Sequence, residues 1–215
     1  PLYSSAASDV YKRQANHSDE IVFGPNMTSV TFQISRALAR TWREGDEVIV
    51  PAPYWVTYPD LALLNGGTPV IVASTVEADF KITPGQLEEA ITPKTKWLVL
   101  NSPCNPTGSA YSPEELKALS EVLLLHPQVW VLCDDIYEHL LYDGAQFATI
   151  AQIEPQLYDR TLTLNGMSKS FCMTGWRVGY AGGPVELIKA MNMLQSQSRF
   201  QIHQSSSGSL RAPLV

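Results

Sequence analysis

Short, almost continuously apolar segments recur through the middle of the chain, and they restrict the possible folds more than any other feature. Their residues are mostly β-branched or aliphatic, which is typical of strands buried on both faces of a parallel sheet. Helix-like segments separate them. The sequence therefore predicts an α/β fold, a mostly parallel sheet with flanking helices. The expected strands are residues 47–50, 69–73, 96–100, 129–133, 161–164 and 177–181.

Four of the intervening segments are expected to be helices: 28–43, 58–64, 113–126 and 184–196. The clearest start is at Ser112, a capping residue followed by Pro113 and two acidic residues, which suit the first turn of a helix. Because these helices alternate with the strands, we expect them to cover both faces of the sheet.

The composition excludes several classes of protein. The net charge of the 215 residues is −6, which provides no basic surface for nucleic acid or an anionic membrane. Apolar runs such as 129–133 are too short to span a bilayer. Three cysteines without CxxC spacing, and no signal peptide, predict reduced thiols and a cytoplasmic location. The histidines show no metal-ligand spacing, so no metal site is expected.

The two ends differ from the regular middle. Residues 1–15 read as a non-native leader, because 4–14 resemble translated adapter sequence. Residues 199–215 lose the α/β pattern and include a Ser-rich run, so we expect an aberrant or disordered tail, for which a frame-shift is one explanation. The domain itself is expected to span 16–198.

Chemically useful side chains follow four of the expected strands. Trp55 follows the first, Asn105 the third, Asp134 and Tyr137 the fourth, and Lys169 the fifth. Parallel sheets bind ligands at the carboxyl ends of their strands, so these groups should meet at one edge.

Lys169 is the central candidate. It lies among small and apolar residues, where a partly desolvated amine could form a Schiff base with an aldehyde. Arg177 follows in the same motif and could hold a phosphate through its guanidinium group. The alternatives are a surface lysine and a structural ion pair.

The other candidates also have two interpretations each. Asp134 could keep a pyridine nitrogen protonated, which makes the ring an electron sink, or it could cap a helix. Asn105 lies in an Asn-Pro-Thr-Gly loop and could bind a ligand or simply turn the chain. Tyr137 and Trp55 could contact a flat ring or pack in the core.

These motifs, in this order and spacing, resemble class I/II pyridoxal-phosphate-dependent aminotransferases. The motifs are Asn105-Pro-Thr-Gly, Asp134-x-x-Tyr137, and Ser168-Lys169 followed by Arg177. Together with the Trp55 segment, they are most similar to bacterial aspartate aminotransferases over residues 45–198. The resemblance implies the large domain of a fold-type I enzyme, with the small domain missing.

The resemblance also implies a role for each residue. Lys169 would bond to pyridoxal 5'-phosphate and move the substrate proton. Asp134 would pair with the ring nitrogen. Asn105 and Tyr137 would bind the ring oxygen, and Trp55 would stack on the ring. Ser168 and Arg177 would bind the phosphate. The implied partners are a small amino acid and a 2-oxo acid, and the parent protein would be a homodimer.

Residues 19–46 are instead similar to class V, cysteine-desulfurase-like aminotransferases. Both branches use a loop at this place for the cofactor phosphate, so Asn26, Met27 and Thr28 are candidate phosphate ligands. Because the family that the sequence resembles changes near residues 45–47, the sequence could be a chimera of two genes joined there.

Two other functions remain open. One is a desulfurase or C–S lyase, for which Cys104 and Cys172 are possible nucleophiles. The other is a non-catalytic fragment, because the small-domain arginine that would grip the substrate α-carboxylate has no counterpart here.

Overall fold

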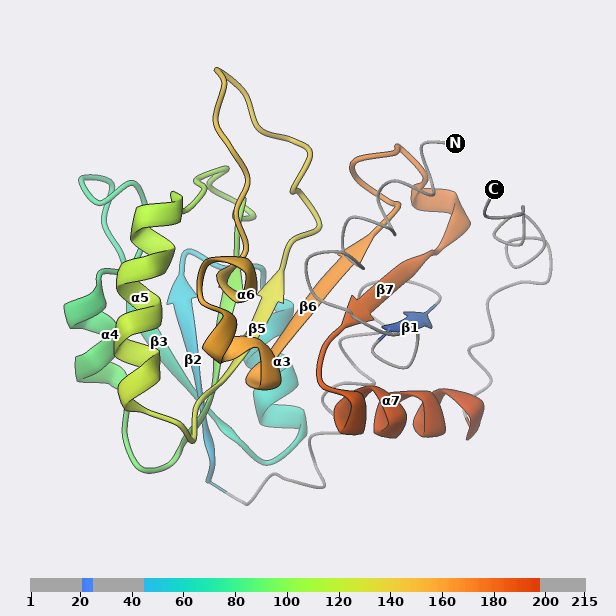
Figure 1. Ribbon diagram of the computed structural model, residues 1–215, viewed down its shortest axis with the longest axis horizontal. Helices are drawn as coiled ribbons and strands as arrows, with labels where there is room; N and C mark the ends of the chain where they lie inside the picture. Colours follow the sequence, from blue (N-terminus) through green and yellow to red (C-terminus); the bar gives the residue numbers. More distant parts are fainter. Residues whose placement is uncertain (1–20, 25–44, 198–215) are drawn as a thin grey trace.

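The computed structural model describes residues 21–24 and 45–197 (Figure 1). Within these residues the strands form one seven-stranded sheet in the order β1-β7-β6-β5-β4-β2-β3. The expected helix at 28–43 and the candidate ligands Asn26, Met27 and Thr28 lie outside the described residues. The strands are β1 (Ile21–Gly24), β2 (Glu47–Ala52), β3 (Thr68–Ala73), β4 (Thr95–Asn101), β5 (Trp130–Asp134), β6 (Thr161–Gly166) and β7 (Gly179–Gly182).

The sheet is mixed, with mostly parallel strands. Strands β3, β2, β4, β5 and β6 are mutually parallel, whereas β7 runs antiparallel to both β6 and β1. The expected strand at 177–181 begins later than predicted, because Arg177 adopts a left-handed conformation at the end of a short helical turn. Since β7 is antiparallel, its first residues lie at the same edge as the carboxyl ends of the parallel strands.

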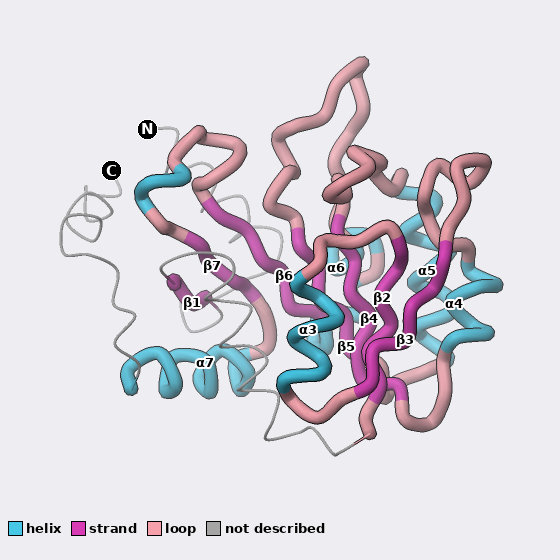
Figure 2. The backbone as a smooth tube through the Cα atoms, turned by 180° about the vertical axis from the view of Figure 1, so that it is seen from behind, coloured by secondary structure: helices cyan, strands magenta, loops and turns pink. Residues whose placement is uncertain are grey.

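Helices cover both faces of the sheet (Figures 1 and 2), which confirms the predicted α/β architecture. Helices α3 (Thr57–Leu64) and α7 (Val185–Gln197) pack on one face. The other face carries α4 (Pro84–Ala90), α5 (Pro113–Leu125) and α6 (Ile150–Ile153). Two 3₁₀-helices, η2 (Pro155–Arg160) and η3 (Thr174–Trp176), complete the described elements.

The alternating side chains of the strands build two apolar cores, one on each face. Val48, Val99 and Leu164 face α3 and α7, whereas Ile49 and Leu98 face α4 and α5. Burial on both faces explains why the strand segments are almost continuously apolar in the sequence.

The start of α5 forms as predicted. The Ser112 hydroxyl accepts from the Glu115 N–H, and the Glu115 carboxylate accepts from the Ser112 N–H, which is a complete capping box. Helix α4 has the same arrangement at Thr83 and Gln86, but this short helix was not predicted.

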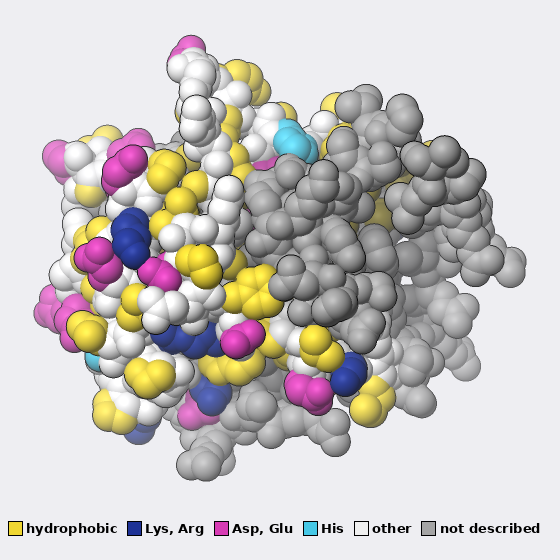
Figure 3. Space-filling model, viewed as in Figure 1, with side chains coloured by type: hydrophobic (Ala, Val, Ile, Leu, Met, Phe, Trp, Pro, Cys, Tyr) yellow, Lys and Arg dark blue, Asp and Glu magenta, His cyan; other side chains and the backbone are white. Residues whose placement is uncertain are grey.

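On the face drawn in Figure 3, the described Lys and Arg side chains are interspersed with Asp and Glu. None of the described helices is long and apolar enough to cross a membrane. Among the described residues, no group of three or more His, Cys, Asp or Glu side chains is arranged to hold a metal ion.

Candidate functional site

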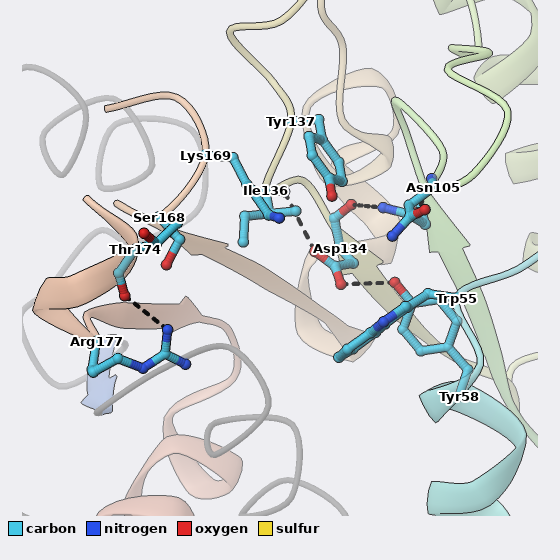
Figure 4. A pocket seen from close by; sticks show the side chains of 11 residues that line it. Trp55, Tyr58, Asn105, Asp134, Ile136, Tyr137, Ser168, Lys169, Thr174 and Arg177 are labelled. Atoms are coloured by element: carbon cyan, nitrogen blue, oxygen red, sulfur yellow. Dashed lines mark hydrogen bonds between the residues drawn. The ribbon is translucent and has the colours of Figure 1, made fainter. Parts of the chain in front are cut away.

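A pocket of about 200 Å³ opens at the carboxyl edge of the sheet (Figure 4). Seven of the predicted site residues line it: Trp55, Asn105, Asp134, Tyr137, Ser168, Lys169 and Arg177. Four further lining residues were not predicted: Tyr58, Asn101, Ile136 and Thr174. The antiparallel direction of β7 brings Arg177 to this edge, and the ends of β2, β4, β5 and β6 bring the others.

Asp134 is the last residue of β5 and lies at the centre of the pocket in Figure 4. Its side chain is 3% exposed and forms no ion pair among the described residues. Oδ2 accepts a 2.7 Å hydrogen bond from the Tyr58 hydroxyl. Burial raises the pKa of Asp134 to about 6, although the bonds from Tyr58 and from the Ile136 N–H act in the opposite direction. A buried carboxylate of this kind favours a cationic partner.

Two aromatic side chains form the wall next to Asp134. Trp55 and Tyr58 meet edge to face, with ring centroids 5.5 Å apart. Tyr58 lies in α3 and is buried, and its pKa is well above the ordinary value because of burial and the neighbouring Asp134. The phenol therefore stays protonated and donates a hydrogen bond to the carboxylate.

Asn105 lies in the loop that follows β4. Its backbone N–H donates to the side chain of Asn101, which in turn donates to the main-chain oxygen of Asp134, both at 2.8 Å. Further bonds close the loop on itself, from the Cys104 N–H to Ser109 O and from the Gly108 N–H to Cys104 O. The loop is thus a compact turn held against the end of β5.

Lys169 lies in the loop between β6 and β7, and Figure 4 shows its amine pointing toward the middle of the pocket. The loop is anchored by Met167, which with Val178 and Tyr180 forms a small buried cluster. Lys169 Nζ lies 5.7 Å from the centroid of the Tyr137 ring. The prediction of a partly desolvated lysine is wrong for this structure, because Lys169 is exposed along with residues 174–177 of the same loop.

Ser168, Thr174 and Arg177 lie together at the opposite end of the pocket from Trp55 and Asn105 (Figure 4). The Arg177 guanidinium donates to the main-chain oxygen of Thr174 at 2.8 Å, and the residue itself has a φ of 54°. Arg177 forms no ion pair among the described residues. Its remaining N–H groups can therefore hold an anion.

These groups fit a flat, cationic ring that carries a phosphate. Asp134 supplies the anionic partner for a protonated ring nitrogen, and Trp55 supplies an aromatic face. Arg177 and Ser168 could supply donors for a phosphate at one end of the pocket, and Lys169 supplies an amine that points toward its middle. An α/β sheet with this donor set at its carboxyl edge fits pyridoxal phosphate, as used by enzymes of the fold-type I class.

Comparisons with known proteins support the assignment to this class of enzymes. The family described as aminotransferase class I and II matches residues 4–212. An aspartate/prephenate aminotransferase of Cereibacter sphaeroides is 67% identical over 162 residues, which are 75% of this chain and 40% of that protein. The aspartate aminotransferase of Rhizobium meliloti is 48% identical over 201 residues, 92% of this chain and 48% of that protein.

A crystal structure of the aspartate aminotransferase from Rhizobium meliloti superimposes with a TM-score of 0.88 at 46% identity. The match covers 99% of this chain and 54% of that one. The chain belongs to the aminotransferase class I and II family, whose enzymes use pyridoxal 5'-phosphate. It spans about half the length of the relatives that it matches.

Proposed function

We propose that this chain is the cofactor-binding part of a pyridoxal-phosphate-dependent transaminase that moves an amino group between an aspartate-like amino acid and a 2-oxo acid. One observation carries the proposal: a buried carboxylate, an amine and a guanidinium line a single pocket, with the guanidinium at one end of it (Figure 4). The names of the similar proteins support aspartate as the amino donor.

When bound, the cofactor supplies an electron sink that allows a proton to leave the substrate α-carbon. Asp134 holds the ring nitrogen in its protonated form, because an opposite charge at contact distance favours the cation. Trp55 fixes the plane of the ring, and Asn105 and Tyr137 bind the ring oxygen. The Lys169 amine would hold the cofactor before the substrate arrives and, once the substrate amine has displaced it, would move a proton to and from the α-carbon.

Ser168 and Arg177 bind the phosphate, and Asn26, Met27 and Thr28 are further candidate ligands for it. Phosphate binding at one end of the pocket and the contact with Asp134 at its centre would fix the ring between them. This orientation matters because proton transfer requires the Lys169 amine on one defined side of the reacting carbon.

We also propose that the protein acts in the cytoplasm and that the parent enzyme is a homodimer. The three cysteines are unpaired in the structure, which suits a reducing compartment. The division into a leader, a domain over 16–198 with a join near 45–47, and a tail over 199–215 remains a prediction.

Amino-group transfer tests the proposal directly. The purified chain with pyridoxal 5'-phosphate is given aspartate and 2-oxoglutarate, and glutamate formation is measured against the Lys169→Ala variant. Glutamate that depends on Lys169 supports the transaminase. Sulfide release from cysteine would instead support the desulfurase, although neither Cys104 nor Cys172 lines the pocket. Turnover of neither substrate would contradict an active transaminase and favour a non-catalytic fragment.

A further inference from the structure

Asn101 links the two segments that carry Asp134 and Asn105. It is the last residue of β4, and its Cα is the register partner of Asp134 at the end of β5. Its side-chain Nδ2 donates to the main-chain oxygen of Asp134, and its Oδ1 accepts from the backbone N–H of Asn105, both at 2.8 Å. Both polar atoms of one amide are therefore engaged, each by a different segment of the pocket.

The Asn101 side chain adds hydrogen bonds beyond the last backbone pair of β4 and β5. Where two strands diverge, their backbone N–H and C=O groups lose their ladder partners and need others. The Asn101 amide provides a partner of each kind, an N–H for the Asp134 carbonyl and an oxygen for the Asn105 amide. The spacing between the end of β5 and the Asn105 loop is thereby set by one rigid, planar group.

Among the described residues, the other hydrogen bonds of the loop do not reach the end of β5. The bonds between Cys104 and Ser109 and between Gly108 and Cys104 lie within the loop, and the Tyr111 N–H donates to Ser102 Oγ at the base of the loop. They make the loop compact. Within the described part of the chain, the contact from Asn101 is the one that ties the backbone of Asn105 to the strand end beside Asp134.

We propose that Asn101 is a positioning residue that fixes Asp134 and Asn105 at the spacing required by the two polar positions of the cofactor ring. The inference rests on the proposed function, which assigns the ring nitrogen to Asp134 and the ring oxygen to Asn105. A flat ring held at both positions tolerates little error in their separation, because hydrogen bonds weaken steeply with distance and angle.

A purely structural role for Asn101 makes a different prediction. Loss of the two bonds would then lower the stability of the protein and leave the electronic properties of the bound cofactor unchanged. The pH dependence of the cofactor absorbance separates the two roles, because a hydrogen bond to the ring oxygen favours its deprotonated form.

The test is a double-mutant cycle of Asn101→Leu and Asn105→Ala on the cofactor-loaded chain. Each single variant should raise the pH midpoint of the absorbance change, by about half a unit to one unit, which is roughly a threefold to tenfold shift of the proton equilibrium. The double variant should shift the midpoint by clearly less than the sum, since Asn101 acts through Asn105.

Asn65→Leu is the matched control. Asn65 also uses its side-chain Nδ2 to bind a main-chain oxygen, that of Leu61 at 2.7 Å, at the end of α3. Its substitution removes an equivalent bond and should leave the midpoint unchanged. If Asn101→Leu does not fold, Asn101→Ala removes the same two bonds without crowding and takes its place.

The inference is overturned if the Asn101 variant keeps the wild-type midpoint while Asn105→Ala shifts it, or if the two shifts add fully. A different result would reject the proposed function itself: if the unmodified chain shows no cofactor absorbance band, there is no cofactor site for Asn101 to organise.

Discussion

The Tyr58 hydroxyl donates a 2.7 Å hydrogen bond to Oδ2 of Asp134, so that α3 and β5 are joined at the wall of the pocket. Both side chains are almost fully buried, at 4% and 3% exposure. Burial raises the pKa of Asp134 to about 6, and the bond from Tyr58 offsets part of this rise. Tyr58 therefore keeps Asp134 available as an anion in a place where a carboxylate would otherwise bind a proton.

Replacement of Tyr58 by Phe should weaken cofactor binding most strongly at low pH. Without the phenol, the pKa of Asp134 rises further, and a larger share of the carboxyl groups is protonated near pH 6. Loss of a hydrogen bond to a charged group lowers the affinity roughly tenfold. Titrations with pyridoxal 5'-phosphate at pH 6 and pH 8 measure the effect, with Tyr54→Phe as a neighbouring control. Equal losses of affinity at pH 6 and pH 8 would refute this explanation.

Asp134 should also make the cofactor-free protein less stable as the pH rises. Its folded pKa of about 6 lies above the ordinary value of 3.8, so the folded state retains a proton that the unfolded state has already released. Stability should fall between about pH 4 and pH 6, by about 3 kcal/mol, and then level off. Denaturant unfolding of the wild type and Asp134→Asn measures this step. This fall in stability should be absent from Asp134→Asn. Parallel plots of unfolding free energy against pH for the two proteins would contradict the prediction.

Arg177 should discriminate between phosphorylated and unphosphorylated ligands. The Arg177→Gln variant should bind pyridoxal 5'-phosphate roughly 10- to 100-fold more weakly, because a charge-assisted contact to the phosphate is lost. Its affinity for pyridoxal, which has no phosphate, should barely change. Direct binding titrations with both ligands test the assignment. An equal loss for the two ligands would mean that Arg177 supports the loop and does not bind the phosphate.

Gly183 should tolerate no side chain, because the chain passes close to β6 before α7. An added Cβ would lie 2.8 Å from Leu162 Cδ1 and 3.1 Å from the Thr161 main-chain oxygen. We expect Gly183→Ala to destabilise the fold by about 1–3 kcal/mol. Gly85→Ala in α4 is the control: its Cβ would meet nothing within 4 Å, and it should be neutral or slightly stabilising. Thermal unfolding that ranks the two variants in the opposite order would be inconsistent with the structure.

The strands were predictable because burial on both faces leaves a direct signal in the sequence. All six expected strands correspond to β2–β7, although the segment at 177–181 begins only at Gly179. The direction of β7 could not be predicted, since apolar composition is the same for parallel and antiparallel pairing. Helix α4 was missed because it is short and contains Gly85, although its Thr83–Gln86 capping box was a usable signal.

The candidate site was predictable where a side chain lies at a strand end or in the loop that follows it, as for Asp134 and Asn105. Tyr58 was missed because its position in an apolar helix is equally typical of a core residue. Asn101 was missed because nothing in a sequence shows which strand lies beside β4. The exposure of Lys169 was also beyond prediction, because it depends on how the loop before β7 is folded.

Reduction with borohydride identifies the lysine that holds the cofactor. The chain is loaded with pyridoxal 5'-phosphate and reduced, and the labelled peptide is then identified. We expect one labelled residue, Lys169, and an absorbance band that disappears on reduction. The label should be lost in Lys169→Ala and retained in Lys189→Ala, which removes another exposed lysine. A label on other lysines, or a band that persists in Lys169→Ala, would contradict the account.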